Sequence, residues 1–331
     1  MEHPDDVIRA VADLALPEWD VGAAKVELVS RSENVVFRVD AEDERTFALR
    51  VHRPGYHTLA ELESEALWTE ALSQAGIGVP LAVPTRAGGH YAVVGVPGTD
   101  EVRHVGLIPW FEGVPLSETI EKASGDADRD SQFEQLGRLM ARMHDQAVAW
   151  RPPSQFQRHA LDADGFMGEA PFWGRFWDIP QLTPEQRKTL IDARARIHAQ
   201  LSEYGKERGT YSVIHADLRS TNVLVKDDRV FVIDFDDAGF GWHQYDLAVV
   251  LFDYVTTPDY QAIEEALIAG YRSQRAISDE GLALLPMFVL VRMLASLGWL
   301  NDRPEVELYK LLPVLIELSC VRAREFLADS F

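Results

Sequence analysis

Short runs of alternating apolar and polar residues dominate the first third of the chain. KVELVS, NVVFRVDAED and RTFALRVHRPG predict three β-strands, with the polar stretch DAEDER as the hairpin loop between the second and the third. YAVVGVPG and RHVGLIPW predict two more strands. Before these two, LAELESEALWTEALSQAG repeats apolar residues at helical spacing and stops at Gly76. With a short amphipathic helix over residues 4–16, the pattern predicts a small sheet domain crossed by one helix.

After Pro109 the pattern becomes helical. Apolar residues recur every three or four positions in SQFEQLGRLMARMHDQAV and in TPEQRKTLIDARARIHAQLSEYG, where Thr183 is a candidate cap and Pro184 takes the first helical position. YDLAVVLFDYV, PDYQAIEEALIAGYRS and two apolar runs predict further helices. We therefore expect an α+β protein with two domains, residues 1–109 and 110–331.

Composition narrows the possible environments. Hydrophobic residues make up 47% of the 331 residues, enough for a sizeable core, and the net charge of −21 argues against nucleic-acid and anionic-membrane partners. The N-terminus has no signal-peptide pattern, and Arg292 interrupts the longest apolar run, so we expect a buried helix and a cytoplasmic protein. The single cysteine, Cys320, lies in an apolar helical run and is expected in the core. A monomer and a homodimer both remain open.

Chemistry-bearing residues gather in VIHADLRSTNVLVKDDRVFVIDFDDAGF. This segment predicts a β-type run, a polar loop and a strand pair, VLVK and VFVID, joined by a turn. Such a hairpin brings Asp234 back to the end of the loop that carries Asp217 and Asn222. Two carboxylates and an amide oxygen suit a hard cation such as Mg²⁺.

The spacing of these residues resembles a known set of motifs. His215-x-Asp217, Asn222 five residues later and the Asp234-Phe235-Asp236 segment look like the H-R-D-x-x-x-x-N and D-F-G motifs of protein kinases. In detail they resemble the aminoglycoside phosphotransferase and choline kinase superfamily more closely. FALRVHRPG, SEALW and YDLAVVL resemble further segments of that superfamily. The resemblance implies a protein-kinase-like fold with two lobes.

The resemblance also implies a role for each matching residue. Asp217 would accept or orient the proton of the attacking hydroxyl, and Asn222 and Asp234 would hold Mg²⁺ against the phosphates of ATP. His215 would be structural, packed beneath the loop. Asp246 would hydrogen-bond the backbone of the catalytic loop.

The nucleotide-binding positions depart from the kinase pattern. Arg50 stands where kinases have a lysine, and its helix partner would be Glu65, with Glu61 as the second choice. Arg50 could bind phosphates or make only an ion pair.

The glycine-rich phosphate loop is also missing. Ser32 and Asn34 are the candidates that replace it, and the adenine edge is expected near Ile108 and Trp110. We expect Asp236 to be satisfied in a loop or at the surface rather than to bind metal.

The acceptor of the phosphate is open. The first hypothesis is an ATP- and Mg²⁺-dependent O-phosphotransferase acting on a small-molecule hydroxyl of an amino alcohol, amino acid, sugar or aminoglycoside. Alternatives are a protein kinase that resembles the bacterial stress-response type and a nucleotide-binding pseudokinase. Trp173 and Trp177 of PFWGRFW could wall the acceptor site or simply pack, and His144 is expected to be a satisfied or exposed histidine.

Overall fold

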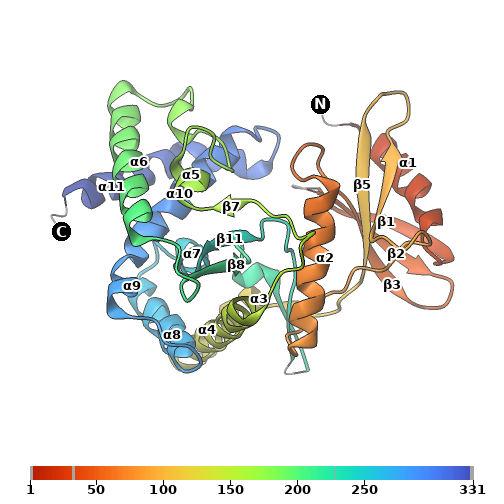
Figure 1. Ribbon diagram of the computed structural model, residues 1–331, viewed down its shortest axis with the longest axis horizontal. Coiled ribbons are helices and arrows are strands. Elements are labelled where there is room, and N and C mark those ends of the chain that lie inside the picture. The colour runs from red at the N-terminus through yellow and green to blue at the C-terminus, as the bar shows by residue number, and fades with distance from the viewer. Residues whose placement is uncertain (1–2, 32–33, 228, 329–331) are drawn as a thin grey trace. The chain divides into compact units, whose positions relative to one another are not determined.

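The computed structural model describes residues 3–31, 34–227 and 229–328, and it divides into two compact units (Figure 1). Unit 1 is formed by the chain up to Val114 together with Pro152–Arg158 and Val223–Asp236. Unit 2 is formed by Pro115–Arg151, His159–Asn222 and the chain from Asp237 onward. The predicted boundary after Pro109 stays a prediction, and the segment Val223–Asp236 joins unit 1 through contacts described below.

The sheet of unit 1 has five antiparallel strands in the order β1-β2-β3-β5-β4. Their bounds are β1 Ala23–Arg31, β2 Val35–Ala41, β3 Thr46–Val51, β4 Tyr91–Gly95 and β5 Val102–Pro109. Strict alternation of buried and half-buried residues along β2 directs Phe37 and Val39 to one face. All five strands were predicted from this alternation, and the predicted sheet is confirmed.

Helix α1 (Asp5–Ala15) packs on the face of the sheet that carries Phe37 and Val39. Ile8 and Val11 on α1 are almost completely buried in this core. Burying an Ile or Val side chain stabilises a fold by roughly 1.5–3 kcal/mol. The short 3₁₀ helix η1 (Leu16–Glu18) follows and adds Leu16 to the core.

Helix α2 (Leu59–Gln74) begins with a capping box, in which Thr58 and Glu61 satisfy each other's backbone N–H groups. It ends before Gly76, whose φ of +76° suits glycine. Trp68 on its buried side packs edge-on against Phe235, with ring centroids 5.4 Å apart. This contact holds the segment Val223–Asp236 within unit 1.

A second sheet in the order β10-β9-β6 uses β6 (Val114–Pro115) and the hairpin of β9 (Val223–Lys226) and β10 (Arg229–Val232). Gly78 forms a parallel bridge with Phe231 on β10. A Cβ atom on Gly78 would lie 2.6 Å from the Val230 carbonyl oxygen, so only glycine allows this close approach. The predicted strand pair VLVK and VFVID is confirmed.

Unit 2 is mainly helical. Its helices are α3 Leu116–Glu121, α4 Asp126–Ala149, α5 Ala163–Met167, α6 Pro184–Tyr204, α7 His243–Phe252, α8 Tyr260–Arg272, α9 Asp279–Ala283, α10 Leu285–Asn301 and α11 Leu312–Ala328, with 3₁₀ helices η2 Phe176–Asp178, η3 Ser220–Asn222 and η4 Glu307–Leu311. Thr183 caps α6 as predicted, and Pro184 takes its first position. Helix α11 packs across α6 (Figure 1), and α10 packs on both α11 and α7.

Helices α4 and α8 approach each other through two glycines. A Cβ atom on Gly270 would lie 2.1 Å from the Glu134 carbonyl oxygen, and one on Gly137 would lie 2.1 Å from that of Leu267. Since no side chain fits at either position, the two helix backbones are in direct contact.

A small sheet in the order β7-β11-β8 lies within unit 2. It consists of β7 (Ala160–Leu161), β8 (Tyr211–Ile214) and β11 (Gly239–Trp242), of which only β8 was indicated by the sequence. The segment GFGW of β11 has two glycines and little β-pattern, so pairing with β8 rather than propensity makes it a strand.

The predicted α+β fold class, with a small antiparallel sheet and a larger helical part, is confirmed. The apolar run around Arg292 forms part of a stretch, Asp279–Asn301, that is long and apolar enough to cross a membrane, and 67% of its apolar 18-residue window is buried. Such burial is that of a core helix. Cys320 is completely buried in α11, as predicted.

Candidate active site

Arg50 is the centre of a buried charge cluster in unit 1. Its guanidinium donates from Nη1 to Glu65 Oε1 at 3.1 Å and from Nη2 to Asp234 Oδ1 at 3.1 Å. Burial opposes the charge on Arg50, but the carboxylates of Glu65, Asp236 and Asp234 raise the pKa of Arg50 above the ordinary value. Arg50 therefore stays cationic and joins strand β3, helix α2 and the segment after β10.

Asp236 is a second fixed point of this cluster. Only 5% of it is exposed, and its carboxylate accepts from Asn34 Nδ2 at 3.1 Å and from Arg50 Nη2 at 3.3 Å. His52 Nδ1 lies 3.4 Å from Asp236 Oδ1. Burial opposes ionisation, but the contact with His52 and the charge of Arg50 hold the pKa of Asp236 well below its usual range.

Asp236 lies in a turn and its carboxylate is satisfied there, as expected, but it is buried rather than at the surface. Its backbone carbonyl also accepts from His57 Nε2 at 2.7 Å. Asn34 is tied down as well, because its Oδ1 accepts from the Arg53 backbone N–H at 3.2 Å. Ser32 lies outside the described residues.

Asp234 differs from Asp236 in its exposure. Half of its side chain is exposed, and its backbone has a φ of +66°. Residues other than glycine adopt this region infrequently, and such conformations cluster at functional sites. The arrangement offers one open carboxylate beside a buried one.

The backbone at Ile108 and Trp110 is already used within the sheet. Ile108 pairs with Ala48, and the Trp110 N–H donates to the Thr46 carbonyl at 2.9 Å. Because backbone groups alternate in direction along an antiparallel strand, the carbonyl of Pro109 faces away from β3. Of the predicted stretch, Pro109 therefore offers the backbone group suited to an adenine edge.

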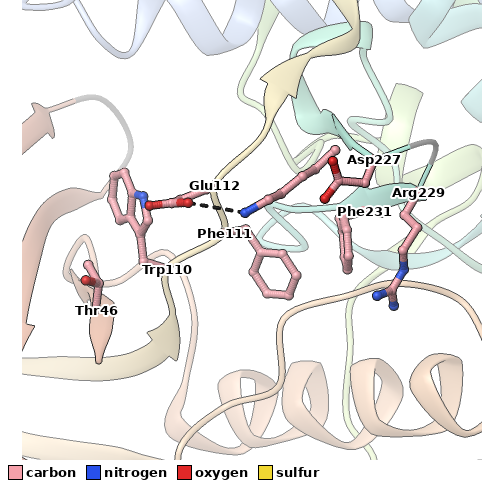
Figure 2. A pocket seen from close by; sticks show the side chains of 8 residues that line it. Thr46, Trp110, Phe111, Glu112, Asp227, Arg229 and Phe231 are labelled. Carbon is pink, nitrogen blue, oxygen red and sulfur yellow. Dashed lines mark hydrogen bonds and ion pairs between the residues drawn. The ribbon is translucent and has the colours of Figure 1, made fainter. Parts of the chain in front are cut away.

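Two hollows lie within unit 1. One of about 20 Å³ beside Arg50 and Phe235 has room for about one water molecule. The other, of about 440 Å³, is shown in Figure 2; it is lined by Thr46, Trp110, Phe111, Glu112, Lys226, Asp227, Arg229 and Phe231. Lys226 pairs with Glu112 across it at 3.2 Å. Among the predicted site residues that the structure describes, only Trp110 lines the larger hollow.

Asp217 and Asn222 lie together on the loop of unit 2 that follows β8. Asn222 Nδ2 donates to Asp217 Oδ2 at 2.9 Å and to the Asp217 carbonyl at 2.8 Å. This fixes the amide so that its oxygen, the atom able to ligate a cation, faces away from Asp217. On the other side of the carboxylate, Arg292 Nη2 donates to Asp217 Oδ1 at 2.6 Å.

Asp246 holds the start of the same loop. Its Oδ1 accepts from the Ala216 N–H at 2.7 Å, and its Oδ2 accepts from the His215 N–H at 3.1 Å. Ala216 has a φ of +65°, which is costly for alanine and needs such support. Complete burial raises the pKa of Asp246 to about 6, and the contacts with the loop oppose that rise. The loop contact inferred for Asp246 is present.

His144 completes this buried network. Its Nε2 lies 3.0 Å from Asp246 Oδ2, and its Nδ1 lies 2.9 Å from the Tyr271 hydroxyl. Burial lowers the pKa of His144 to about 3, so the ring is neutral and donates to the Asp246 carboxylate. The expectation of a satisfied histidine agrees with these two bonds.

The aromatic segment PFWGRFW is packed inside unit 2. Trp173 and Trp177 are 4% and 3% exposed. Arg194 lies over the Trp177 ring at 4.0 Å, and Trp173 stacks on Tyr245 at 5.9 Å. Since these ring faces are occupied by side chains of the same unit, the segment builds the core rather than offering open rings to an acceptor.

Arg292 is the site residue that the sequence did not reveal as one. In the sequence Arg292 only interrupts an apolar run, whereas in the structure its guanidinium donates a hydrogen bond to Asp217. A single cation inside an otherwise apolar helix was the available signal, because a buried arginine requires an acidic partner.

The chain is similar to several known kinases and matches one protein family. The sequence profile of the phosphotransferase enzyme family matches residues 25–283. A solved microcompartment-associated aminopropanol kinase is 33% identical, with a TM-score of 0.84 over 97% of this chain and 98% of that one. Amicoumacin kinase hAmiN, solved with AMP-PNP, Ca²⁺ and Ami, is 17% identical, with a TM-score of 0.76 over 97% and 94% of the two chains. Stress response kinase A of Escherichia coli is 24% identical over 91% of this chain and 83% of its own length.

Proposed function

The chain belongs to the phosphotransferase enzyme family, and we propose that it is a kinase that transfers the γ-phosphate of ATP to a hydroxyl of a small molecule. The observation that carries the proposal is the setting of Asp217. This carboxylate is held at both oxygens, by Arg292 and Asn222, on a loop that Asp246 clamps through two backbone N–H groups. A carboxylate fixed in this way can orient a hydroxyl and accept its proton, an effect worth about 10²–10⁴-fold in rate.

We assign magnesium binding to Asn222 and Asp234. Their donors fit the ion, since Asn222 presents an amide oxygen and Asp234 a half-exposed carboxylate, and Mg²⁺ prefers oxygen ligands. When bound, the ion neutralises charge on the phosphates during transfer. Asn222 would in addition keep Asp217 oriented through its Nδ2.

Arg50 is assigned to the phosphates of ATP. A guanidinium can bind phosphate through two parallel hydrogen bonds. In the structure its Nη2 is shared between Asp234 and Asp236, so a change of partner by Asp234 toward the cation would release part of that donor. Glu65 would then keep Nη1 in place.

For the acceptor we propose a small amino alcohol. The support is the 33% identity over nearly the whole chain to a protein described as an aminopropanol kinase. The net charge of −21 is compatible with a cationic acceptor, because a negative field raises the local concentration of cations.

The proposal is tested by ADP release from ATP and Mg²⁺ in the presence of single acceptors. The panel contains amino alcohols, hydroxy amino acids, sugars and aminoglycosides, and Asp217→Asn serves as the blank. Saturable, Asp217-dependent ADP release with an amino alcohol, accompanied by a phosphate ester of the expected mass, supports the proposal. Release with none of the acceptors would contradict it.

The resemblance to stress response kinase A keeps a protein acceptor as the second candidate. Label transfer from γ-labelled ATP to protein bands of a lysate, without label in the small-molecule fraction, would favour it. ATP binding without transfer to either fraction would instead favour the pseudokinase.

A further inference from the structure

We propose that Arg292 is a positioning residue for Asp217, so that the transfer depends on a cation from helix α10. The inference rests on the proposed function and extends it, since Asp217 is the group that Arg292 would hold. Arg292 and Asp217 both belong to unit 2, and the pair is short, with 2.6 Å between Nη2 and Oδ1.

Arg292 is buried beside Asp217 and Tyr245. Its side chain is 12% exposed and is the one charged group of helix α10, where an unpaired guanidinium would be costly. Burial opposes its charge, but Tyr245, Asp217 and Asp237 raise the pKa of Arg292 above the ordinary value. Its Nε is buried without a hydrogen-bond partner among the described residues. The arginine therefore stays charged, and Asp217 is the acid to which it donates a hydrogen bond.

The two oxygens of the Asp217 carboxylate accept from different parts of the chain. Asn222 holds Oδ2 from within the loop, and Arg292 holds Oδ1 from a helix 75 residues further along the chain. With only the Asn222 contact, the carboxylate could rotate about its terminal torsion, which is broad. The second contact fixes the plane of the carboxylate and thereby the direction in which a hydroxyl can approach.

This role predicts a loss of kcat rather than of nucleotide binding. A misplacement of about 1 Å at a reacting group costs roughly 100-fold in rate. We therefore expect Arg292→Ala to lower kcat about 100-fold, while the Kd for ATP, measured by calorimetry, stays unchanged. Arg292→Lys should recover part of the loss, because an ammonium keeps the charge but not the planar fork.

Chemical rescue separates positioning from a purely structural effect. Millimolar guanidinium should raise the kcat of Arg292→Ala at least about tenfold. It should not raise the kcat of the double variant Arg292→Ala with Asp217→Asn. The matched control is Arg303→Ala, which removes another buried arginine just beyond the end of α10 and should show no rescue.

Each outcome decides the question. Wild-type kcat in Arg292→Ala, or equal rescue in Arg303→Ala, overturns the inference while the proposed function stands, because the wild-type enzyme still turns over. If the wild-type protein phosphorylates no acceptor, the proposed function fails and the inference fails with it.

Discussion

Replacement of Asp246 by asparagine should separate the stability of the protein from its activity. Asp246 is completely buried and accepts from the backbone N–H groups of His215 and Ala216 and from His144. An asparagine of the same size has one oxygen instead of two, so its NH₂ group must face one of these donors. The charge-assisted bond that is lost is worth about 1.5–3 kcal/mol.

The loss is offset by removal of a buried charge. The pKa of Asp246 is raised from 3.8 to about 6, so ionised Asp246 costs the folded state about 3 kcal/mol at neutral pH. We therefore expect the free energy of unfolding of Asp246→Asn at pH 7.5 to lie within about 2 kcal/mol of the wild type. The kcat should nevertheless fall about 100-fold, because Ala216 loses the support of its strained conformation.

The pH dependence gives a second readout with a defined sign. Because the pKa of Asp246 is raised in the fold, protonation of Asp246 stabilises the folded state at low pH. This stabilisation is lost as the pH rises through about 6. The wild type should gain about 1.4 kcal/mol relative to Asp246→Asn between pH 7.5 and pH 5.0. All other titrating groups are common to both proteins and cancel in the difference.

Urea unfolding of both proteins at these two pH values measures the effect, and ADP release measures the activity. Asp192→Asn is the control, since it removes an exposed carboxylate that pairs with Lys188; it should change stability by less than about 1 kcal/mol. An equal pH dependence of the wild type and Asp246→Asn would show that Asp246 does not titrate with a raised pKa, and full activity of the variant would show that the loop does not depend on its carboxylate.

Three further changes test other parts of the account. Arg50→Lys should lower the free energy of unfolding by about 2 kcal/mol and weaken ATP binding, because an ammonium cannot replace the guanidinium fork that joins Glu65 to Asp234 and Asp236. Calorimetry measures the ATP affinity, and an unchanged affinity would argue against the assignment of Arg50 to the phosphates. Asn222→Ala should raise the Mg²⁺ concentration for half-maximal activity by at least about tenfold, and an unaltered Mg²⁺ titration would remove Asn222 from the metal site. Gly270→Ala should cost about 1–3 kcal/mol in urea unfolding, because its Cβ would meet the Glu134 carbonyl at 2.1 Å; an unchanged transition would show that α4 and α8 can separate freely.

The fold and the loop that carries Asp217 and Asn222 were accessible from the sequence because both are encoded locally. The alternation along β2 and the helical spacing of α4 and α6 depend on neighbouring residues, and the structure has these elements. The spacing of Asp217, Asn222 and Asp234 carries the resemblance to known phosphotransferases, and the loop contacts of Asp246, in the matching segment YDLAVVL, agree with it.

The remaining features depend on contacts between distant segments. Asp236 sits in a polar run that is typical of a loop, and only its contacts with Asn34, 202 residues earlier, and with Arg50 make it a buried charge. Likewise, the use of the Trp110 N–H by Thr46 follows from strand register. A single sequence contains no signal for that register beyond the order of the strands.

Arg292 illustrates the same limit on the catalytic side. Its position in an apolar helix indicates that a buried partner exists, but 75 residues separate it from Asp217. Which acid it reaches depends on how α10 packs on α7, a tertiary contact that the periodicity of either helix does not specify.

The most direct test of the central claim is a comparison of the wild type with Asp217→Asn in two measurements on the same preparations. Calorimetry gives the Kd for ATP in the presence of Mg²⁺, and mass spectrometry detects a phosphorylated amino alcohol. The account predicts similar ATP affinity for both proteins and product from the wild type alone, with a loss of at least about 100-fold in the variant. Product formation by Asp217→Asn at the wild-type rate would contradict the account.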